Sequence, residues 1–213
     1  MKFGNGCWLL KDGFGGFYPQ EVYEYKITDK EVIIYAPTHK INHRGDTLGG
    51  AVLTIIISSP MPEVLRIQVY HYMGMAQKAP AFELNLDNPH PLLVEDNEDK
   101  LLISSGGITL EIGKSNWYMR YLRNGRIITE SASKDLAMFK ENWRGDYYDI
   151  NGDLDNTYMR QQHNIGVGEL LYGTGERFTP FVKNGQSIEI YNEDGGTGTD
   201  QSYKNIPFFV SNK

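Results

Sequence analysis

Short runs of β-branched and aromatic residues, separated by Gly, Asn, Asp and Pro, recur along most of the chain. Runs of this kind with alternating apolar and polar positions are typical of strands, whereas helical spacing is weak throughout. The pattern predicts strands at Val22–Ile27, Glu31–Ala36, Ala51–Ser58, Val64–Tyr72, Lys100–Ser104, Ile108–Ile112, Trp117–Arg123, Arg126–Glu130, Leu170–Tyr172 and Ser187–Ile190. We therefore expect an all-β protein built from antiparallel strands.

Two pairs of these strands are expected to form hairpins. Asn124-Gly125 lies between two β-rich runs, and this dipeptide best tolerates the positive φ angles of a type I′ turn. The turn Ser104–Gly107 joins a second pair of runs in the same way. Sequential hairpins of this kind indicate a meandering antiparallel sheet.

The remaining stretches give weaker signals. Ser133–Asn142 is the one place where a helical turn or two is expected. Glu141–Asn164 is polar, rich in Gly and Asp and without clear periodicity, so it is expected to be a long loop. Because no repeat or linker interrupts the chain, we predict one domain over residues 1–213.

Composition limits the possible partners. The hydrophobic fraction of 40% and the charged fraction of 23% are ordinary for a globular protein. The net charge of −6, without a cluster of Lys and Arg, argues against a nucleic-acid partner. The single cysteine, Cys7, cannot form an internal disulfide, and no signal-like or membrane-spanning apolar stretch is present. A cytoplasmic location is therefore expected.

Known metal and nucleophile patterns match poorly. Asp149–Asp155 begins like a calcium-binding loop, but Leu154 replaces the required Gly and Arg160 replaces the closing Glu, so an acidic solvent-exposed turn is the better interpretation. The five histidines lack the spacing of a metal site, and no Gly-x-Ser-x-Gly elbow is present. We expect neither a metal nor another cofactor.

Two glycine-rich segments are the remaining candidates. Gly173 and Gly175 are expected to turn the chain tightly as it leaves a strand, placing Glu176 and Arg177 at one rim, where they would form ion pairs with neighbours. The segment Asn192–Asp200 is too rich in Gly to pack in a core and must project as a loop. It is either a flexible turn or a loop that delivers a carboxylate to sugar hydroxyl groups.

The sequence also carries ordered motifs of a known family. Gly166–Phe178 resembles the Gly-Glu-x-x-Tyr-Gly-x-Gly-Glu-Arg-Phe signature that precedes the barrel in family 31 glycoside hydrolases. Further segments are similar to the bacterial α-xylosidase branch, namely Gly6–Leu9, Leu122–Gly125, Asn184–Ser187, Tyr191–Thr197 and Tyr203–Phe208. Thr174 departs from the family, which usually has an apolar residue there.

The resemblance implies an N-terminal, galactose-mutarotase-like antiparallel β-sandwich that packs on a catalytic (β/α)8 barrel and lends a loop to its active site. The family's catalytic carboxylates lie in that barrel, so no catalytic residue is expected before Lys213. Asp194 matches the family's substrate-contacting Asp, and Thr197 and Asn192 either contact sugar or, as we favour, brace the loop. The expected partners are an α-xyloside or related α-glycoside, the barrel of the same parent chain and, for the parent enzyme, further copies of itself.

Other functions remain open at this point. Abundant Tyr and Trp on a sandwich would also suit a stand-alone carbohydrate-binding module, and the sandwich class alone would suit a sugar mutarotase. The parent could equally be an α-glucosidase, because the residues that discriminate the sugar lie mainly outside this chain. The sheet is expected either to expose an unpaired edge or to adjust its pairing near the end of the chain, with partial disorder or self-association near Asn205–Lys213.

Overall fold

The computed structural model describes residues 3–4, 9–71, 90–141, 157–192, 202 and 204–213. The chain divides into two compact units, the sandwich unit Lys2–Asn164 and the C-terminal unit Ile165–Lys213, apart from Met1. The elements are β1(Phe14–Phe17), β2(Glu24–Ile27), β3(Glu31–Pro37), the 3-10 helix η1(Arg44–Leu48), β4(Val52–Ser58), β5(Arg66–Tyr70), β6(Leu93–Asp96), β7(Lys100–Ser105), β8(Ile108–Gly113), β9(Met119–Arg123), β10(Arg126–Ser131), β11(Ala137–Glu141), β12(Thr157–Arg160), β13(Leu171–Gly175) and β14(Asn205–Ser211).

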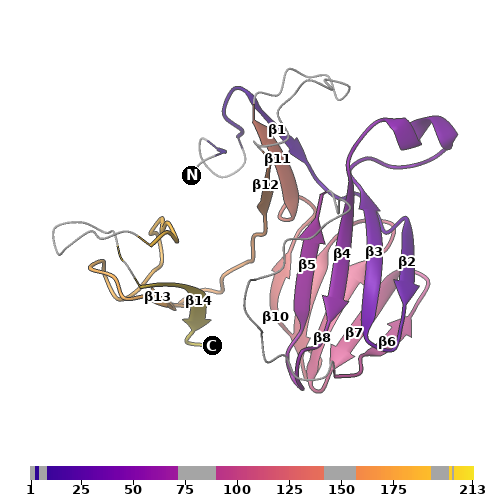
Figure 1. The fold of residues 1–213 in the computed structure, drawn as a ribbon. Coiled ribbons are helices and arrows are strands. Elements are labelled where there is room, and N and C mark those ends of the chain that lie inside the picture. The colour runs from indigo at the N-terminus through magenta and orange to yellow at the C-terminus, as the bar shows by residue number, and fades with distance from the viewer. Residues whose placement is uncertain (1–2, 5–8, 72–89, 142–156, 193–201, 203) are drawn as a thin grey trace. The chain divides into compact units, whose positions relative to one another are not determined.

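Two antiparallel sheets form the body of the sandwich unit. One has the strand order β2-β3-β4-β5 and the other β10-β9-β8-β7-β6, and they face each other as two layers (Figure 1). Alternate residues point to opposite faces of a strand, so every second side chain of β3 and β4 enters the space between the sheets. The core consists chiefly of Val32, Ile34, Ala36, Leu53, Ile55, Ile57, Leu101, Ile103, Leu110, Ile112, Trp117 and Met119. The predicted all-β antiparallel sandwich is confirmed.

Both predicted hairpins are present. Asn124 and Gly125 have φ angles of 49° and 77°, as a type I′ turn requires, and they connect β9 to β10. Gly106, with a φ of 60°, lies in the turn between β7 and β8. The five-stranded sheet therefore follows the chain order β6 to β10 without a crossover.

A third, three-stranded sheet has the order β1-β11-β12 and corrects two predictions. The helical turn expected within Ser133–Asn142 is wrong, because β11 occupies half of that stretch and the described residues before it form a turn and a bend, and β12 lies inside the loop expected at Glu141–Asn164. The ring of Phe139, which is fully buried in β11, stacks on Phe3 with a centroid separation of 4.6 Å. Met138 beside it is also buried, so β11 lacks the alternation by which a strand is recognised.

Other differences are smaller. The strands β1, β6 and β14 were not predicted, and the strand expected at Ser187–Ile190 is wrong, since those residues have no regular structure. The acidic turn Asp149–Asp155 and Cys7 lie outside the described residues. In the part of the chain that is described, no helix has the length and apolar character to cross a membrane.

The outer face of the five-stranded sheet carries a ladder of alternating charges across β7, β8, β9 and β10. Glu111 Oε2 lies 2.8 Å from Lys100 Nζ, and its Oε1 lies 3.3 Å from Arg120 Nη1. Arg120 Nε in turn lies 3.1 Å from Glu130 Oε2. Tyr118 donates its hydroxyl hydrogen to Glu111 at 3.0 Å. The Glu111 side chain is only 9% exposed, so these partners replace the water that it loses on folding.

The charged ladder predicts that Glu111→Gln lowers the stability of the fold by an amount that depends on pH. Burial by itself raises the pKa of Glu111, but hydrogen bonds from Lys100 and Tyr118 outweigh it, and the pKa lies below the ordinary 4.5. A carboxyl with a lowered folded-state pKa adds stability above its unfolded pKa and loses it as the pH falls through the folded value. Urea unfolding should therefore show a less stable variant at pH 7, and the difference from the wild type should shrink as the pH falls below about 4.5.

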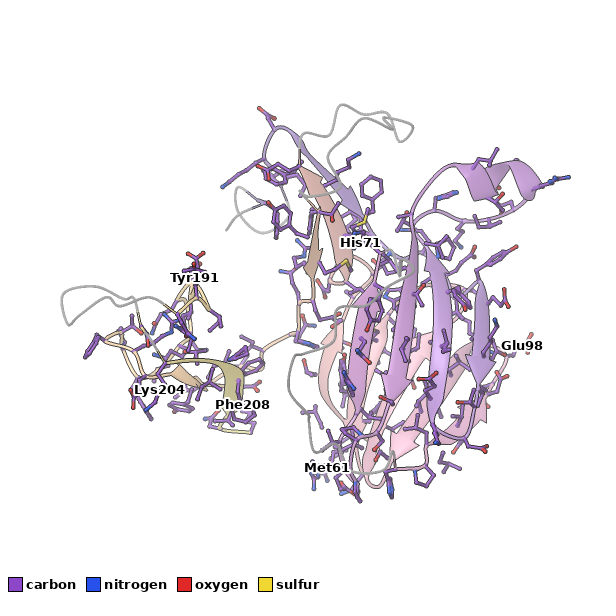
Figure 2. The ribbon with its side chains drawn as sticks, viewed as in Figure 1. Met61, His71, Glu98, Tyr191, Lys204 and Phe208 are labelled. Atoms are coloured by element: carbon purple, nitrogen blue, oxygen red, sulfur yellow. The ribbon has the colours of Figure 1, made fainter. Side chains whose placement is uncertain are left out.

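Glu98→Gln is the matched control, because Glu98 is an exposed residue of the turn between β6 and β7 (Figure 2). Its unfolding free energy should follow that of the wild type at every pH, within about 0.5 kcal/mol. A Glu111→Gln difference that stays constant from neutral to acid pH would contradict the proposed role of the charged ladder.

The buried position of Leu110 predicts that Leu110→Ala strongly lowers the free energy of unfolding. Leu110 is fully buried between the two sheets, and its truncation should lower the unfolding free energy by about 2–5 kcal/mol through lost burial and a residual cavity. Leu93→Ala is the control, since Leu93 is 65% exposed, and it should change the unfolding free energy by less than about 0.5 kcal/mol. Urea unfolding followed by circular dichroism measures both, and equal midpoints would show that the core is assigned incorrectly.

Candidate functional site

The predicted substrate-binding residues lie in and beside the segment 193–201. Asp194 and Thr197 are outside the described residues, whereas Asn192 is described. Asn192 forms an isolated parallel bridge with Ser202, so the residues on either side of the segment lie next to each other. The described residues around the two ends of the segment belong to the C-terminal unit, and we call them the base of the segment.

A glycine bulge in β13 shapes this base. Gly173, Thr174 and Gly175 have φ angles of 116°, 73° and 91°, and the β13–β14 register shifts between the two glycines. A Cβ atom on Gly175 would lie 2.2 Å from Lys204 O, and one on Gly173 would lie 2.6 Å from Phe208 O. Only glycine allows the two backbones to come so close. The glycines thus do not end the strand, as expected from sequence, but bend it within the ribbon that β13 forms with β14.

Glu176 and Arg177 directly follow the bulge and lie at the base of the segment. Glu176 pairs with Lys204, with Oε1 and Nζ 3.1 Å apart, so its expected ion pair is present on the surface. Arg177 donates to three oxygens: Nε donates to Thr174 O at 3.4 Å, and Nη2 donates to Glu189 O and to the side-chain oxygen of Asn205. The guanidinium thereby links three separate stretches of the C-terminal unit.

Asn205 is the centre of this network, and the sequence did not single it out. Its backbone N–H and its Nδ2 both donate to Asn192 Oδ1, each at 3.1 Å. Nδ2 also donates to Tyr191 O at 2.7 Å and to Ser202 O at 2.6 Å, while Oδ1 accepts from Arg177. One carboxamide therefore contacts residues on both sides of the segment 193–201. The signal available in the sequence was the motif Tyr203–Phe208, which contains Asn205.

Ser202 strengthens the same junction. It is only 6% exposed, and its hydroxyl donates to Glu176 O and accepts from the backbone N–H of Lys204 at 3.1 Å. Asn192 has its side-chain oxygen occupied by Asn205, which is the arrangement that a bracing residue needs. A direct contact of Asn192 with sugar stays a prediction.

The described residues contain no cluster of ionisable groups that would form a metal centre. Over the described ranges, no group of three or more His, Cys, Asp and Glu side chains is placed to hold a metal ion. The base of the segment contains hydrogen bonds among amide, hydroxyl, guanidinium and carbonyl groups. Such a set can hold a loop in one orientation toward a polar ligand.

These features define the chain as a galactose-mutarotase-like β-sandwich with a C-terminal ribbon. Residues 54–213 match the family described as the glycosyl hydrolase 31 N-terminal galactose mutarotase-like domain, and the chain belongs to this family. It is 35% identical over 212 residues to the α-xylosidase XylQ of Lactiplantibacillus pentosus, covering 99% of this chain and 26% of the relative. It is 33% identical over 221 residues to an α-xylosidase of Emericella nidulans, covering 99% of this chain and 28% of the relative.

Solved structures agree on the fold. The cycloalternan-forming enzyme of Listeria monocytogenes, in complex with a pentasaccharide substrate, matches with a TM-score of 0.65 and 18% identity over 93% of this chain and 17% of that one. A family 31 dextranase of Flavobacterium johnsoniae, complexed with glucose, matches with a TM-score of 0.64 and 16% identity over 91% of this chain and 21% of that one. The chain thus spans about a quarter of the curated relatives and less of these structures.

The bulge predicts that Gly175→Ala destabilises the ribbon through a backbone clash. The new methyl group would meet Lys204 O at 2.2 Å, so β13 and β14 would have to separate at this point. The free energy of local opening should fall by more than about 2 kcal/mol. Hydrogen exchange of the β14 amides, followed by NMR, measures this opening.

Gly185→Ala separates the clash from backbone strain. Gly185 also has a positive φ of 74°, but nothing lies within 4 Å of a Cβ atom placed there. Its cost should be that of the left-handed backbone alone, about 1–2 kcal/mol, without faster exchange along β14. Equal effects of the two substitutions on β14 would show that the close backbone approach does not constrain the ribbon.

Proposed function

We propose that this chain is the non-catalytic N-terminal domain, residues 1–213, of a retaining α-glycosidase, an α-xylosidase, in which it packs on the catalytic barrel and supplies a substrate-subsite loop. Membership of the glycosyl hydrolase 31 N-terminal family supports the proposal. The relatives named α-xylosidases align with 99% of the chain and extend far beyond it. The parent would act in the cytoplasm on α-xylosides or related α-glycosides, without a metal, nucleic acid or membrane as partner.

The observation that carries the docking part is the exposed apolar surface of β14. Phe208 is 63% exposed and Phe209 57%, and consecutive side chains of a strand point to opposite faces. Ile206 and Val210 are 51% and 47% exposed. A two-stranded ribbon is marginally stable in water by itself, and one with apolar side chains bare on both faces requires a cover.

The catalytic barrel of the same parent chain is the cover that we propose. In this family the two catalytic Asp residues belong to the barrel, as the resemblance implies, and two carboxylates about 5–5.5 Å apart form and then hydrolyse a glycosyl-enzyme intermediate. The present chain contributes neither carboxylate. Its chemical role is to bind and orient the sugar at the edge of the site.

Asp194 is the group that we assign to this role. An ionised carboxylate accepts hydrogen bonds from two sugar hydroxyl groups, and the Gly-rich sequence around Asp194 allows the backbone to approach a ligand. The pairing of Asn192 with Ser202 supports the proposal, because it anchors both ends of the segment to the ribbon. Thr197 and Asn192 brace the loop in this proposal.

Steady-state kinetics of the parent enzyme test the proposal. Asp194→Ala should lower kcat/KM for 4-nitrophenyl α-xyloside by about 10- to 100-fold, the loss expected for a charge-assisted hydrogen bond. Asp29→Ala is the control, because Asp29 is exposed in the turn between β2 and β3, and it should leave kcat/KM unchanged. The 213-residue chain alone should not turn over the substrate, and measurable turnover by it would overturn the assignment.

The same assay distinguishes the alternative parent. An α-glucosidase would show a higher kcat/KM for 4-nitrophenyl α-glucoside than for the α-xyloside, with the Asp194→Ala loss transferred to the glucoside. The similarity to two α-xylosidases over nearly the whole chain favours the xyloside.

A further inference from the structure

We infer that the four residues Gln161–Asn164 form a strap that is latched to β10 by the hydroxyl group of Ser131, and that opening of this strap lengthens the tether of the C-terminal unit. The strap is the last segment of the sandwich unit, and the C-terminal unit begins at Ile165. All of these residues are described.

The strap lies along the outer edge of β10, the last strand at one side of the five-stranded sheet. The backbone N–H of Asn164 donates to Glu130 O at 3.0 Å, and Asn164 O accepts from the Thr129 hydroxyl at 2.8 Å. Nearer the start of the strap, Gln162 N donates to Asp135 O at 3.0 Å. The strap therefore satisfies polar groups along an edge strand, where they would otherwise face water or another chain.

The hydroxyl group of Ser131 fixes the middle of the strap. Ser131 is 1% exposed, and its hydroxyl donates to Gln162 O at 2.5 Å and accepts from Gln161 Nε2 at 2.7 Å. Because a hydroxyl group has one hydrogen, we assign the hydrogen of the third contact, 3.3 Å long, to His163 Nδ1. One buried oxygen thus contacts three of the four residues of the strap.

Apolar burial contributes little to the strap. None of its residues is buried, and Gln161, His163 and Asn164 are exposed. The ring of His163 meets the edge of the Tyr121 ring at a centroid separation of 5.3 Å. A segment held by hydrogen bonds at the surface opens at a lower free energy than strands whose side chains fill a core. The strap should therefore open before the two sheets of the sandwich separate.

The chain is anchored again directly after the strap. In the C-terminal unit, Gly166 N donates to Glu169 Oε2 at 2.7 Å, and Glu169 N donates to Gly166 O at 3.0 Å. Only Ile165, which is 51% exposed, lies between Asn164 and this turn. With the strap closed, the connection between the two anchored segments is therefore a single residue.

Opening of the strap adds four residues to this connection. Four extended residues span up to about 14 Å, whereas one spans up to about 3.6 Å. A longer connection gives the C-terminal unit more freedom to move independently of the sandwich unit. Ser131 is therefore a positioning residue, which acts through the strap on the freedom of the C-terminal unit.

Ser131→Ala removes the latch, and Ser105→Ala is its matched control. Ser105 belongs to β7 of the same sheet, is also 1% exposed, and bonds through its hydroxyl to Ser59 Oγ at 2.8 Å. Both variants lose a buried hydroxyl group, but only Ser131→Ala loses contacts with the strap.

Thr129→Val is a second, milder variant. Val keeps the shape of Thr and its preference for strands, but it cannot donate to Asn164 O. Combined with Ser131→Ala, it removes the hydroxyl groups that hold both the middle and the end of the strap.

Hydrogen exchange of the 213-residue chain, followed by NMR, measures the opening of the strap. The amides of Gln162 and Asn164 should exchange about 10-fold faster in Ser131→Ala than in the wild type, as expected for the loss of one or two hydrogen bonds. The core amide of Leu110 should change less. In Ser105→Ala, acceleration of the strap amides should not exceed that of Leu110.

NMR relaxation of the amides of β13 and β14 measures how independently the C-terminal unit tumbles. In the double variant of Ser131→Ala and Thr129→Val, exchange of the strap amides should accelerate roughly 100-fold, and the rotational correlation time of β13 and β14 should become shorter. In Ser105→Ala this correlation time should equal that of the wild type.

The outcomes test the latch and the tether separately. Equal acceleration of the strap amides in Ser131→Ala and Ser105→Ala, or no acceleration in Ser131→Ala, would disprove the latch. If Ser131→Ala does not fold, Thr129→Val alone decides, with an expected acceleration of Asn164 exchange of about 5-fold. Faster exchange with an unchanged correlation time in the double variant would disprove the tether. None of these results bears on turnover by the parent enzyme, which Asp194→Ala tests by itself.

Discussion

At Gly175 the backbones of β13 and β14 approach so closely that a single methyl group would lie 2.2 Å from Lys204 O. The base of the segment 193–201 lies beside this contact, because Lys204 N donates to the Ser202 hydroxyl. The register of the ribbon shifts here, Asn205 pairs with Gly175, and Arg177 donates to Asn205 Oδ1. Because backbone atoms make the contact, it constrains the site more strictly than a contact between flexible side chains would.

The two units differ in how they are stabilised. The sandwich unit buries complete rows of side chains on β3, β4, β7 and β8, which removes apolar surface from water on a scale that can support folding. The C-terminal unit relies on hydrogen bonds and leaves most of the apolar side chains of β14 exposed. The candidate site thus lies on the unit that is less able to stabilise itself, which makes the hydrogen bonds of Asn205 and Arg177 more important there than they would be in the sandwich.

The sequence predicted the parts of the fold in which one face of a strand is buried. β3 and β4 alternate regularly, and Asn124-Gly125 specifies its turn through positive φ angles alone. β11 was missed because Met138 and Phe139 are both buried, and β14 because its apolar run contains Pro207 and has no polar face. The hydrogen bonds of Asn205 could not be predicted from residue patterns, since two of its partners, Tyr191 O and Ser202 O, are backbone carbonyl groups, which no side-chain pattern identifies. The family motifs included Asn205 but gave no reason for it.

Thr174 shows that the backbone conformation of the bulge, and not the side chain at its centre, constrains this position. A β-branched residue with a φ of 73° is strained, and the left-handed conformation costs about 1–2 kcal/mol for any residue other than glycine. Any residue other than glycine would meet the same cost at this position, so the strain belongs to the backbone geometry and not to the side chain. The Thr174 hydroxyl donates to Gly173 O at 2.5 Å, a local hydrogen bond that an apolar side chain cannot make. The position therefore tolerates exchange of its side chain, whereas the glycines on both sides do not, because the approach of β14 leaves no room for a Cβ atom.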